Sequence, residues 1–117
     1  MNYELSAALL LLQSDIVGIE EDKGWRPNNN TFPESLCLIH SEVSEALEAF
    51  REIGFDKRTR EDGKPDDVAS ELADVLIRVL STWAQFLTPN GYDCGSEVLK
   101  KMAYNESREF RHGGKRL

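Results

Sequence analysis

Residues 41–50, SEVSEALEAF, decide the fold class because they continue an apolar stripe with the spacing of an α-helix. On a helical wheel, the stripe consists of Leu36, Ile39, Val43, Leu47 and Phe50. Pro33 suits the first turn of a helix, and Gly54 suits the position just after the last turn. The pattern therefore predicts a helix over about 33–53, with Thr31 or Phe32 as its N-cap and the apolar stripe in the core.

Two acidic residues of this helix, Glu42 and Glu45, lie neither on the apolar stripe nor on the polar face opposite it. They share a third face with Leu38, Ala46 and Ala49. Charged side chains among small and apolar neighbours predict a partly buried site rather than a solvated surface.

Similar apolar spacing outlines three more helices, over Tyr3–Asp22, from Asp66 or Asp67 to about Leu87, and over about Ser96–Phe110. Loops rich in Gly, Pro, Asn or charge separate the four segments, and no strand-like alternation competes. Short connections favour antiparallel neighbours. The sequence therefore predicts an all-α bundle of four to five helices, in a single domain over residues 1–112 with a flexible tail at 113–117.

The segment over 66–87 is expected to be the central helix, because more than half of its circumference is apolar. The apolar positions are Val68, Leu72, Val75, Leu76, Val79, Leu80, Trp83 and Phe86. Four helices leave some of this surface uncovered, which predicts a homo-oligomer, either a dimer or a tetramer.

Composition restricts the class of partner. The chain has 117 residues and a net charge of −7, which disfavours a nucleic acid polymer as partner. The apolar run ALLLLQ is too short to span a membrane, and Glu4 precedes it where a signal peptide would be positively charged. The two cysteines have no disulfide or metal-ligand spacing. We expect a cytoplasmic protein with no membrane segment and with buried, reduced thiols.

A second acidic pair, Glu71 and Asp74, lies in SELADVLIR at residues 70–78, and its i, i+3 spacing places both side chains on one helix face. If this helix packs antiparallel to the helix over 33–53, four carboxylates converge. Like charges at short range resist joint ionisation, and a divalent cation relieves that conflict. Ligands that are all oxygen favour Mg²⁺ or Mn²⁺. The alternative is that the acids are solvated and that Arg78 pairs with Asp74.

The two motifs resemble the signature of the MazG-like all-α nucleoside triphosphate pyrophosphohydrolases, which is E-E-x-x-E, a loop and E-x-x-D. SEVSE matches the first element except that Ser41 replaces its first Glu, and ELAD matches the second. The C-terminal KMAYNESREFRHGG resembles the basic last helix of small members, so the resemblance covers about residues 5–114. It implies a MazG-like domain that hydrolyses nucleoside triphosphates between the α- and β-phosphates.

The resemblance also implies the roles of the acidic residues. Metal ligands would be Glu42, Glu45, Glu71 and Asp74, and the ion would be Mg²⁺, with Mn²⁺ possible. Glu45 and Glu42 are the expected catalytic residues, and one of these acids would take the proton of the attacking water. Glu48 is a candidate base that is not a ligand, although it falls on the polar face. With Ser41 in place of Glu, the number of metal ions stays open.

Residues for the rest of the nucleotide are expected elsewhere in the chain. Lys101, Asn105 and Arg108 recur at i, i+4 and i+7 and could bind the outer phosphates, or they form a solubilising basic helix end. Trp25 either stacks on the base or covers the core.

The expected role is house-cleaning of the dNTP pool, and a single substrate such as dUTP or phosphoribosyl-ATP is a narrower option. A non-catalytic helical module for protein–protein interaction is the alternative from another class.

Overall fold

The computed structural model describes residues 2–110, and all of its regular elements are helical. Helix α1 spans Tyr3–Asp22, α2 spans Phe32–Ile53, α3 spans Val68–Thr82 and α4 spans Cys94–Ser107. A π-helical segment, η1 (Trp83–Leu87), continues α3, and a short 3-10 turn, η2 (Thr88–Asn90), follows it. The prediction of an all-α fold is confirmed for this part of the chain. The predicted tail at 113–117 lies outside the described residues.

Local capping explains where α2 and α3 begin. Thr31 and Glu34 form a capping box at the start of α2, in which each side chain bonds the backbone N–H of the other residue. The Asp67 carboxylate accepts from the Ser70 N–H at 3.0 Å and caps α3. Hydrogen bonds from Ser70 and from the Arg58 backbone lower the pKa of Asp67.

The predicted end of the third helix near Leu87 is confirmed, whereas both predicted ends of the last helix were wrong. The segment over 66–87 is helical to Leu87, but its hydrogen bonding changes to the π type after Thr82. The last helix begins at Cys94 and ends at Ser107, instead of running from Ser96 to Phe110. Asp93 explains the earlier start, because its carboxylate accepts from the Ser96 N–H at 2.9 Å and so acts as the N-cap.

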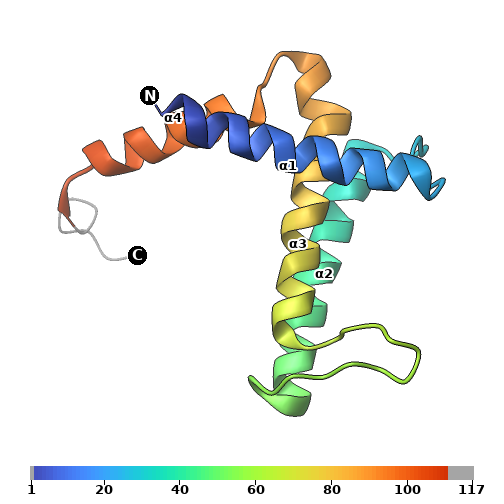
Figure 1. Ribbon diagram of the computed structural model, residues 1–117. Coiled ribbons are helices and arrows are strands. Elements are labelled where there is room, and N and C mark those ends of the chain that lie inside the picture. Colours follow the sequence, from blue (N-terminus) through green and yellow to red (C-terminus); the bar gives the residue numbers. More distant parts are fainter. Residues whose placement is uncertain (1, 111–117) are drawn as a thin grey trace.

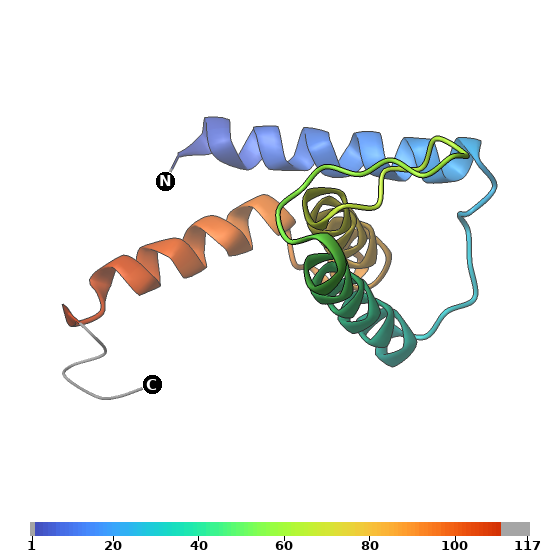
Figure 2. The ribbon, with the colours of Figure 1, turned by 90° about the horizontal axis from the view of Figure 1, so that it is seen from below.

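The helices form two pairs. Helices α2 and α3 lie side by side and antiparallel, and α1 crosses their upper end (Figure 1). Helix α4 leaves this crossing beside the N-terminal half of α1 and points away from α2 (Figure 1). Seen along α2 and α3, both helices lie on the same side of α1 (Figure 2). Helix α3 is central as predicted, since it packs against both α2 and α1.

A small core sits where α1, α3 and α4 meet. Ile16, Leu80 and Cys94 are buried there, and Leu9, Leu10 and Trp83 pack around them. Burial raises the pKa of the Cys94 thiol, so this cysteine stays protonated at neutral pH. Helices α1 and α4 approach so closely that a Cβ at Gly95 would clash with Ser6. Cys37 is exposed, so the prediction that both thiols are buried was wrong for this residue.

The predicted core stripe of α2 is not buried within the chain. Leu36, Val43, Leu47 and Phe50 are exposed, and so are Leu72 and Leu76 of α3. Instead, α2 packs on α3 through its small residues, because Ala46 and Ala49 are only 5% and 4% exposed. The face that carries the acidic residues is therefore the packing face. No helix within residues 2–110 combines the length and hydropathy needed to cross a membrane.

Candidate metal centre

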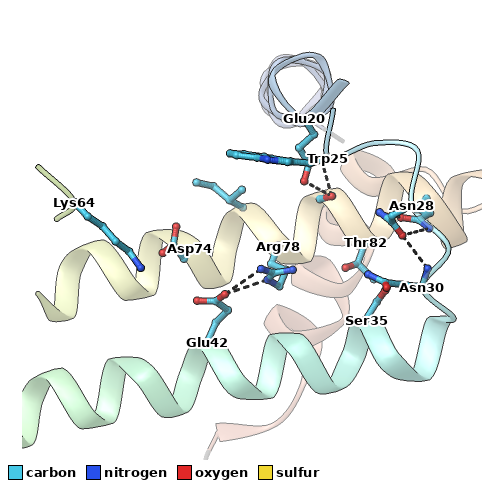
Figure 3. A pocket seen from close by; sticks show the side chains of 13 residues that line it. Glu20, Trp25, Asn28, Asn30, Ser35, Glu42, Lys64, Asp74, Arg78 and Thr82 are labelled. Carbon is cyan, nitrogen blue, oxygen red and sulfur yellow. Dashed lines mark hydrogen bonds and ion pairs between the residues drawn. The ribbon is translucent and has the colours of Figure 1, made fainter. Parts of the chain in front are cut away.

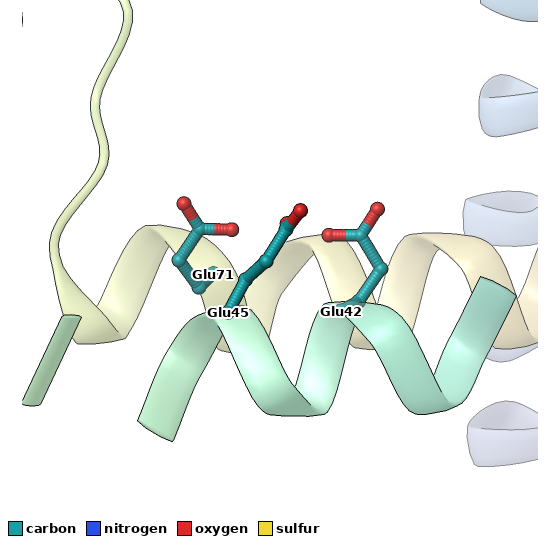
Figure 4. Close-up of side chains that lie close together, drawn as sticks. All are labelled: Glu42, Glu45 and Glu71. Atoms are coloured by element: carbon teal, nitrogen blue, oxygen red, sulfur yellow. The ribbon is translucent and has the colours of Figure 1, made fainter. Parts of the chain in front are cut away.

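Three carboxylates from two helices meet at the edge of the α2–α3 contact. Glu42 and Glu45 come from α2 and Glu71 comes from α3, and each offers an oxygen within 4.8 Å of the others (Figure 4). The three side chains point to the same side of the helix pair (Figure 4). The expectation that acids of the two motifs converge is met for these three residues.

Small side chains on α2 make this convergence possible. Ala46 and Ala49 are buried, so the axes of α2 and α3 can approach closely. Glu42 and Glu45 stand one turn apart on the border of the same face. Carboxylates in that position lie near the partner helix, and Glu42 is half-buried there while Glu45 is exposed.

Glu71 is the most informative member of the group. The residue is 7% exposed, and within residues 2–110 its carboxylate receives no hydrogen bond and forms no ion pair. Its oxygens still reach solvent, because no fully buried side-chain oxygen within residues 2–110 lacks a hydrogen-bond partner. Three carboxylates this close together repel one another when all are ionised, and a bound cation relieves that repulsion. The donor set consists of oxygen alone, which is the set that Mg²⁺ and Mn²⁺ prefer. The residues therefore fit a hard divalent cation.

Among the described residues, Arg78 is the cation that forms an ion pair with this group. Its Nη2 and Nε atoms both lie 3.2 Å from Oε1 of Glu42. The alternative in which Arg78 pairs with Asp74 of its own helix was wrong, because the side chain extends across the seam to α2. The pair offsets the charge of Glu42, whereas Glu45 and Glu71 form no ion pair with any residue in 2–110.

Asp74 lies beside this group rather than in it. Its carboxylate is not among the three that gather within 4.8 Å. It lines the neighbouring cavity together with Glu42 and Arg78 (Figure 3). Its assignment as a fourth ligand stays a prediction. Ser41 is exposed on α2, and Glu48 pairs with Arg51 at 3.6 Å on the exposed face.

A cavity of about 430 Å³ opens next to the acidic group, and we refer to it as the first cavity. It extends between the loop after α1 and the sides of α2 and α3 (Figure 3). Trp25 lies on its wall and is 64% exposed, so this indole is not covered by the core of the chain. An exposed aromatic ring on a cavity wall can stack on a planar ligand.

Hydrogen bonds to α3 fix the loop that carries Trp25. The Ser81 hydroxyl donates to Glu20 at the end of α1 at 2.7 Å. Arg26 donates to the Ser81 hydroxyl at 3.1 Å and pairs with Glu20 at 3.4 Å. Arg26 precedes a cis peptide bond to Pro27. The hydrogen bonds of Glu20, Arg26 and Ser81 therefore restrain the segment that carries the Trp25 indole.

Polar side chains line the far end of the first cavity. The amides of Asn28 and Gln85 exchange two hydrogen bonds, of 3.1 and 3.0 Å. Amide groups both donate and accept, so this pair can exchange its mutual bonds for bonds to a polar ligand. Their side chains come from the loop before α2 and from η1.

The predicted phosphate-binding stripe lies elsewhere in the chain. Lys101, Asn105 and Arg108 belong to α4 or its C-cap, and none of them lines the first cavity. Asn105 instead lines a mostly apolar recess between α1 and α4, and the Lys101 ammonium sits 4.8 Å from the centre of the Tyr104 ring. One chain alone does not bring this stripe to the acidic group, and its phosphate role stays a prediction.

Several residues of the site were not foreseen from the sequence. Lys64, Asn28 and Gln85 were passed over because they lie in a charged loop, an Asn cluster and a predicted core helix. The position of Lys64 between the two acidic motifs was the one signal that could have identified it.

Comparison of the chain with protein-family models, with curated proteins and with solved structures gave no match in any of the three.

Proposed function

We propose that the protein is a Mg²⁺-dependent nucleoside triphosphate pyrophosphohydrolase that converts (d)NTPs to monophosphates and pyrophosphate. The observation that carries this proposal is the convergence of Glu42, Glu45 and Glu71, whose carboxylates offer oxygens within 4.8 Å of one another, with Glu42 also on the wall of the 430 Å³ cavity. The resemblance of the two acidic motifs to those of MazG-like enzymes supports the same reaction.

The acidic residues differ in burial, and we assign their roles accordingly. Glu71 is buried and is oriented by the contact between α2 and α3, so it serves as a fixed ligand. Glu42 and Glu45 complete the ligand set, and Asp74 can join from the cavity side. A bound divalent ion offsets the charge of the phosphates and lowers the pKa of coordinated water. Glu45 is exposed and unpaired within residues 2–110, so it can also accept a proton from water.

The first cavity suits the nucleoside part of such a substrate. Its volume of about 430 Å³ falls within the usual range for small-molecule sites, roughly 300–1,000 Å³. Trp25 offers a stacking surface at one wall, and the amide pair offers hydrogen bonds. The combination supports a role in house-cleaning of the dNTP pool.

We propose further that the protein acts as a homodimer or tetramer. Leu47, Leu72 and Leu76 are 51%, 54% and 53% exposed, and apolar patches of this kind mark interaction surfaces. The accessible surface is 9008 Å², whereas a compact chain of this mass exposes roughly 6,400 Å². A second copy that packs its own α2 and α3 against this surface would complete a four-helix core.

The exposed apolar stripe also favours a second candidate function. A helical module for protein–protein interaction would use the stripe to bind a different chain, and its acidic residues would need no metal. Such a module should tolerate the change Glu45→Gln without loss of its activity.

The decisive experiment measures pyrophosphate release from a panel of canonical and damaged dNTPs, with and without Mg²⁺. Wild type should release pyrophosphate only with the metal, and Glu45→Gln should reduce the rate at least about 100-fold. Glu97→Gln is the matched control, because Glu97 lies on α4 outside the first cavity and should leave the rate unchanged.

Two results would count against the enzyme. The first is release that does not depend on metal, and the second is full activity of a folded Glu45→Gln variant. Mg²⁺ titration by calorimetry checks the site separately, because Glu71→Gln should lose binding whichever nucleotide is the substrate.

A further inference from the structure

The loop between α2 and α3 forms a short hairpin. Thr59 and Pro65 make an isolated antiparallel bridge, and the Arg60 N–H donates to the Lys64 carbonyl at 2.8 Å. Gly63 turns the chain with a φ of 89°, a conformation that glycine adopts without strain. Arg60 and Lys64 therefore stand opposite each other across the hairpin.

Arg58 ties the base of this hairpin to both helices. Its guanidinium pairs with Glu52 of α2 at 2.9 Å and with Asp66 at 2.8 Å, and these acids raise its pKa. Its backbone N–H donates to Asp67, the N-cap of α3, at 3.1 Å. The hairpin is thus held against the ends of α2 and α3, close to the acidic group.

A second cavity, of about 220 Å³, lies between this hairpin and the acidic group. Glu45 and Glu71 face it from the helices, and Arg60 and Lys64 face it from the hairpin. Glu42 and Asp74 line the first cavity instead. The acidic group therefore stands between a larger cavity with an aromatic wall and a smaller cavity whose wall carries both acidic and cationic residues.

Lys64 belongs to both cavities. Figure 3 shows its side chain reaching from the loop toward Asp74. Within residues 2–110 its ammonium forms no ion pair, although carboxylates line the same two cavities. An unpaired cation at the junction of the two cavities is available for an anionic ligand.

We propose that the hairpin binds the β- and γ-phosphates of the substrate, while the nucleoside occupies the first cavity. This inference rests on the proposed function. It orients the bound substrate so that its nucleoside and its outer phosphates lie on opposite sides of the acidic group. In the reaction, an oxygen of water forms a bond to the α-phosphorus and its proton passes to a carboxylate. The bond from the α-phosphorus to the bridging oxygen breaks, and pyrophosphate leaves with the electron pair into the second cavity.

The size of the second cavity and the pairing of the charges on its wall support this orientation. A pyrophosphate group is small and strongly anionic, and the second cavity is lined by five carboxylates and three cationic residues. Glu48 is paired with Arg51 outside the cavity. Glu45 and Glu71 would be neutralised by the divalent cation of the proposed function. Arg58 is already engaged by Glu52 and Asp66, which leaves Arg60 and Lys64 for the ligand. Arg60 has one exposed acidic neighbour, Asp62, at 3.7 Å, and a pair of that kind is weak.

The test is calorimetric binding of inorganic pyrophosphate in the presence of Mg²⁺. Lys64→Gln and Arg60→Gln should each weaken pyrophosphate binding about tenfold, and Lys64→Arg should restore most of it. Binding of a nucleoside monophosphate should change less than about twofold in the same variants. Lys57→Gln is the matched control, since Lys57 lies in the same loop and lines neither cavity.

Three results would overturn the inference: no pyrophosphate binding by wild type, unchanged pyrophosphate binding by Lys64→Gln, or an equal loss for pyrophosphate and monophosphate. A loss in Lys101→Gln instead would assign the phosphates to α4. The proposed function is tested by a different result. If the protein binds pyrophosphate through Lys64 but hydrolyses no nucleotide, the phosphate site is supported and the proposed enzymatic activity is contradicted.

Discussion

Two faces of α2 differ in a way that the hydropathy of the helix alone does not indicate. One face carries Ala46 and Ala49 with two glutamates at its border, and it is buried against α3. The other face carries Val43, Leu47 and Phe50, the largest apolar side chains of the helix centre, and it is exposed. Within one chain, the small residues of α2 contact α3, and its large apolar residues remain exposed.

The difference assigns separate tasks to the two faces. Small residues let α2 and α3 approach closely enough for carboxylates on both helices to share one site. Large apolar residues bury more area when a partner covers them, so they suit association between chains. In the proposed function, the metal site forms at the contact within a chain, and the proposed oligomer would form at a contact between chains.

The largest effect is expected when a charge is placed on the exposed apolar face of α2. Leu47→Glu should weaken self-association about 100-fold or more, because an unpaired carboxylate would be buried at the interface. Analytical ultracentrifugation over a concentration series measures the effect. Ser44→Glu, on the neighbouring polar surface, is the control and should change little. A wild-type mass of one chain at micromolar concentration would contradict the division of faces.

The reverse change enlarges a residue of the buried face. Ala46→Leu should push α2 away from α3, with a cost in stability of about 1–3 kcal/mol. The carboxylates would separate, so the affinity for Mg²⁺ should fall by about 10- to 100-fold. Urea unfolding and calorimetry check the two effects. A variant with normal metal affinity would show that the spacing of the helices does not position the ligands.

A smaller effect is expected at the ion pair across the seam. Arg78 competes with a metal for Glu42, so Arg78→Gln should bind Mg²⁺ or Mn²⁺ about two- to fivefold more tightly, which is the range of a partly exposed pair. Arg51→Gln removes a comparable pair on the exposed face and should leave the affinity unchanged. Weaker binding by Arg78→Gln would make the arginine a support of the site rather than a competitor.

The smallest effect concerns the N-cap that sets the start of α3. The folded state lowers the pKa of Asp67 below its usual 3.8, so the stabilisation by its charge is complete above that pH. It is lost as the pH falls through the lowered value. The gap in unfolding free energy between wild type and Asp67→Asn should therefore shrink in acid. Asp15→Asn, on exposed α1, is the control, and a gap that grows in acid would contradict the sign.

Caps and periodicity made most of the fold predictable. The limits of α1 and α2 and the N-caps Thr31 and Asp67 follow from a few neighbouring residues, so sequence patterns were sufficient. The change to π-type hydrogen bonding after Thr82 was missed, and so was the start of α4 at Cys94, which depends on the N-cap Asp93. A helical wheel identifies apolar faces but not which of them packs within one chain.

The candidate site was predictable to a similar degree. The i, i+3 spacing of acids on two antiparallel helices was enough to bring Glu42, Glu45 and Glu71 together. The partner of Arg78 depended on the spacing between α2 and α3, which no local pattern encodes. The position of Lys64 depended on a hairpin tied to both helices by Arg58.

The bonds of Arg58 have an evolutionary consequence. Because they hold the base of the hairpin, the residues of its tip can change without disturbing either helix. Mutation at positions 60–64 can therefore alter the charge offered to a ligand while the carboxylates stay in register. A scaffold with this separation can acquire a new anion preference by single substitutions, and variation among descendants of this chain should concentrate at the tip.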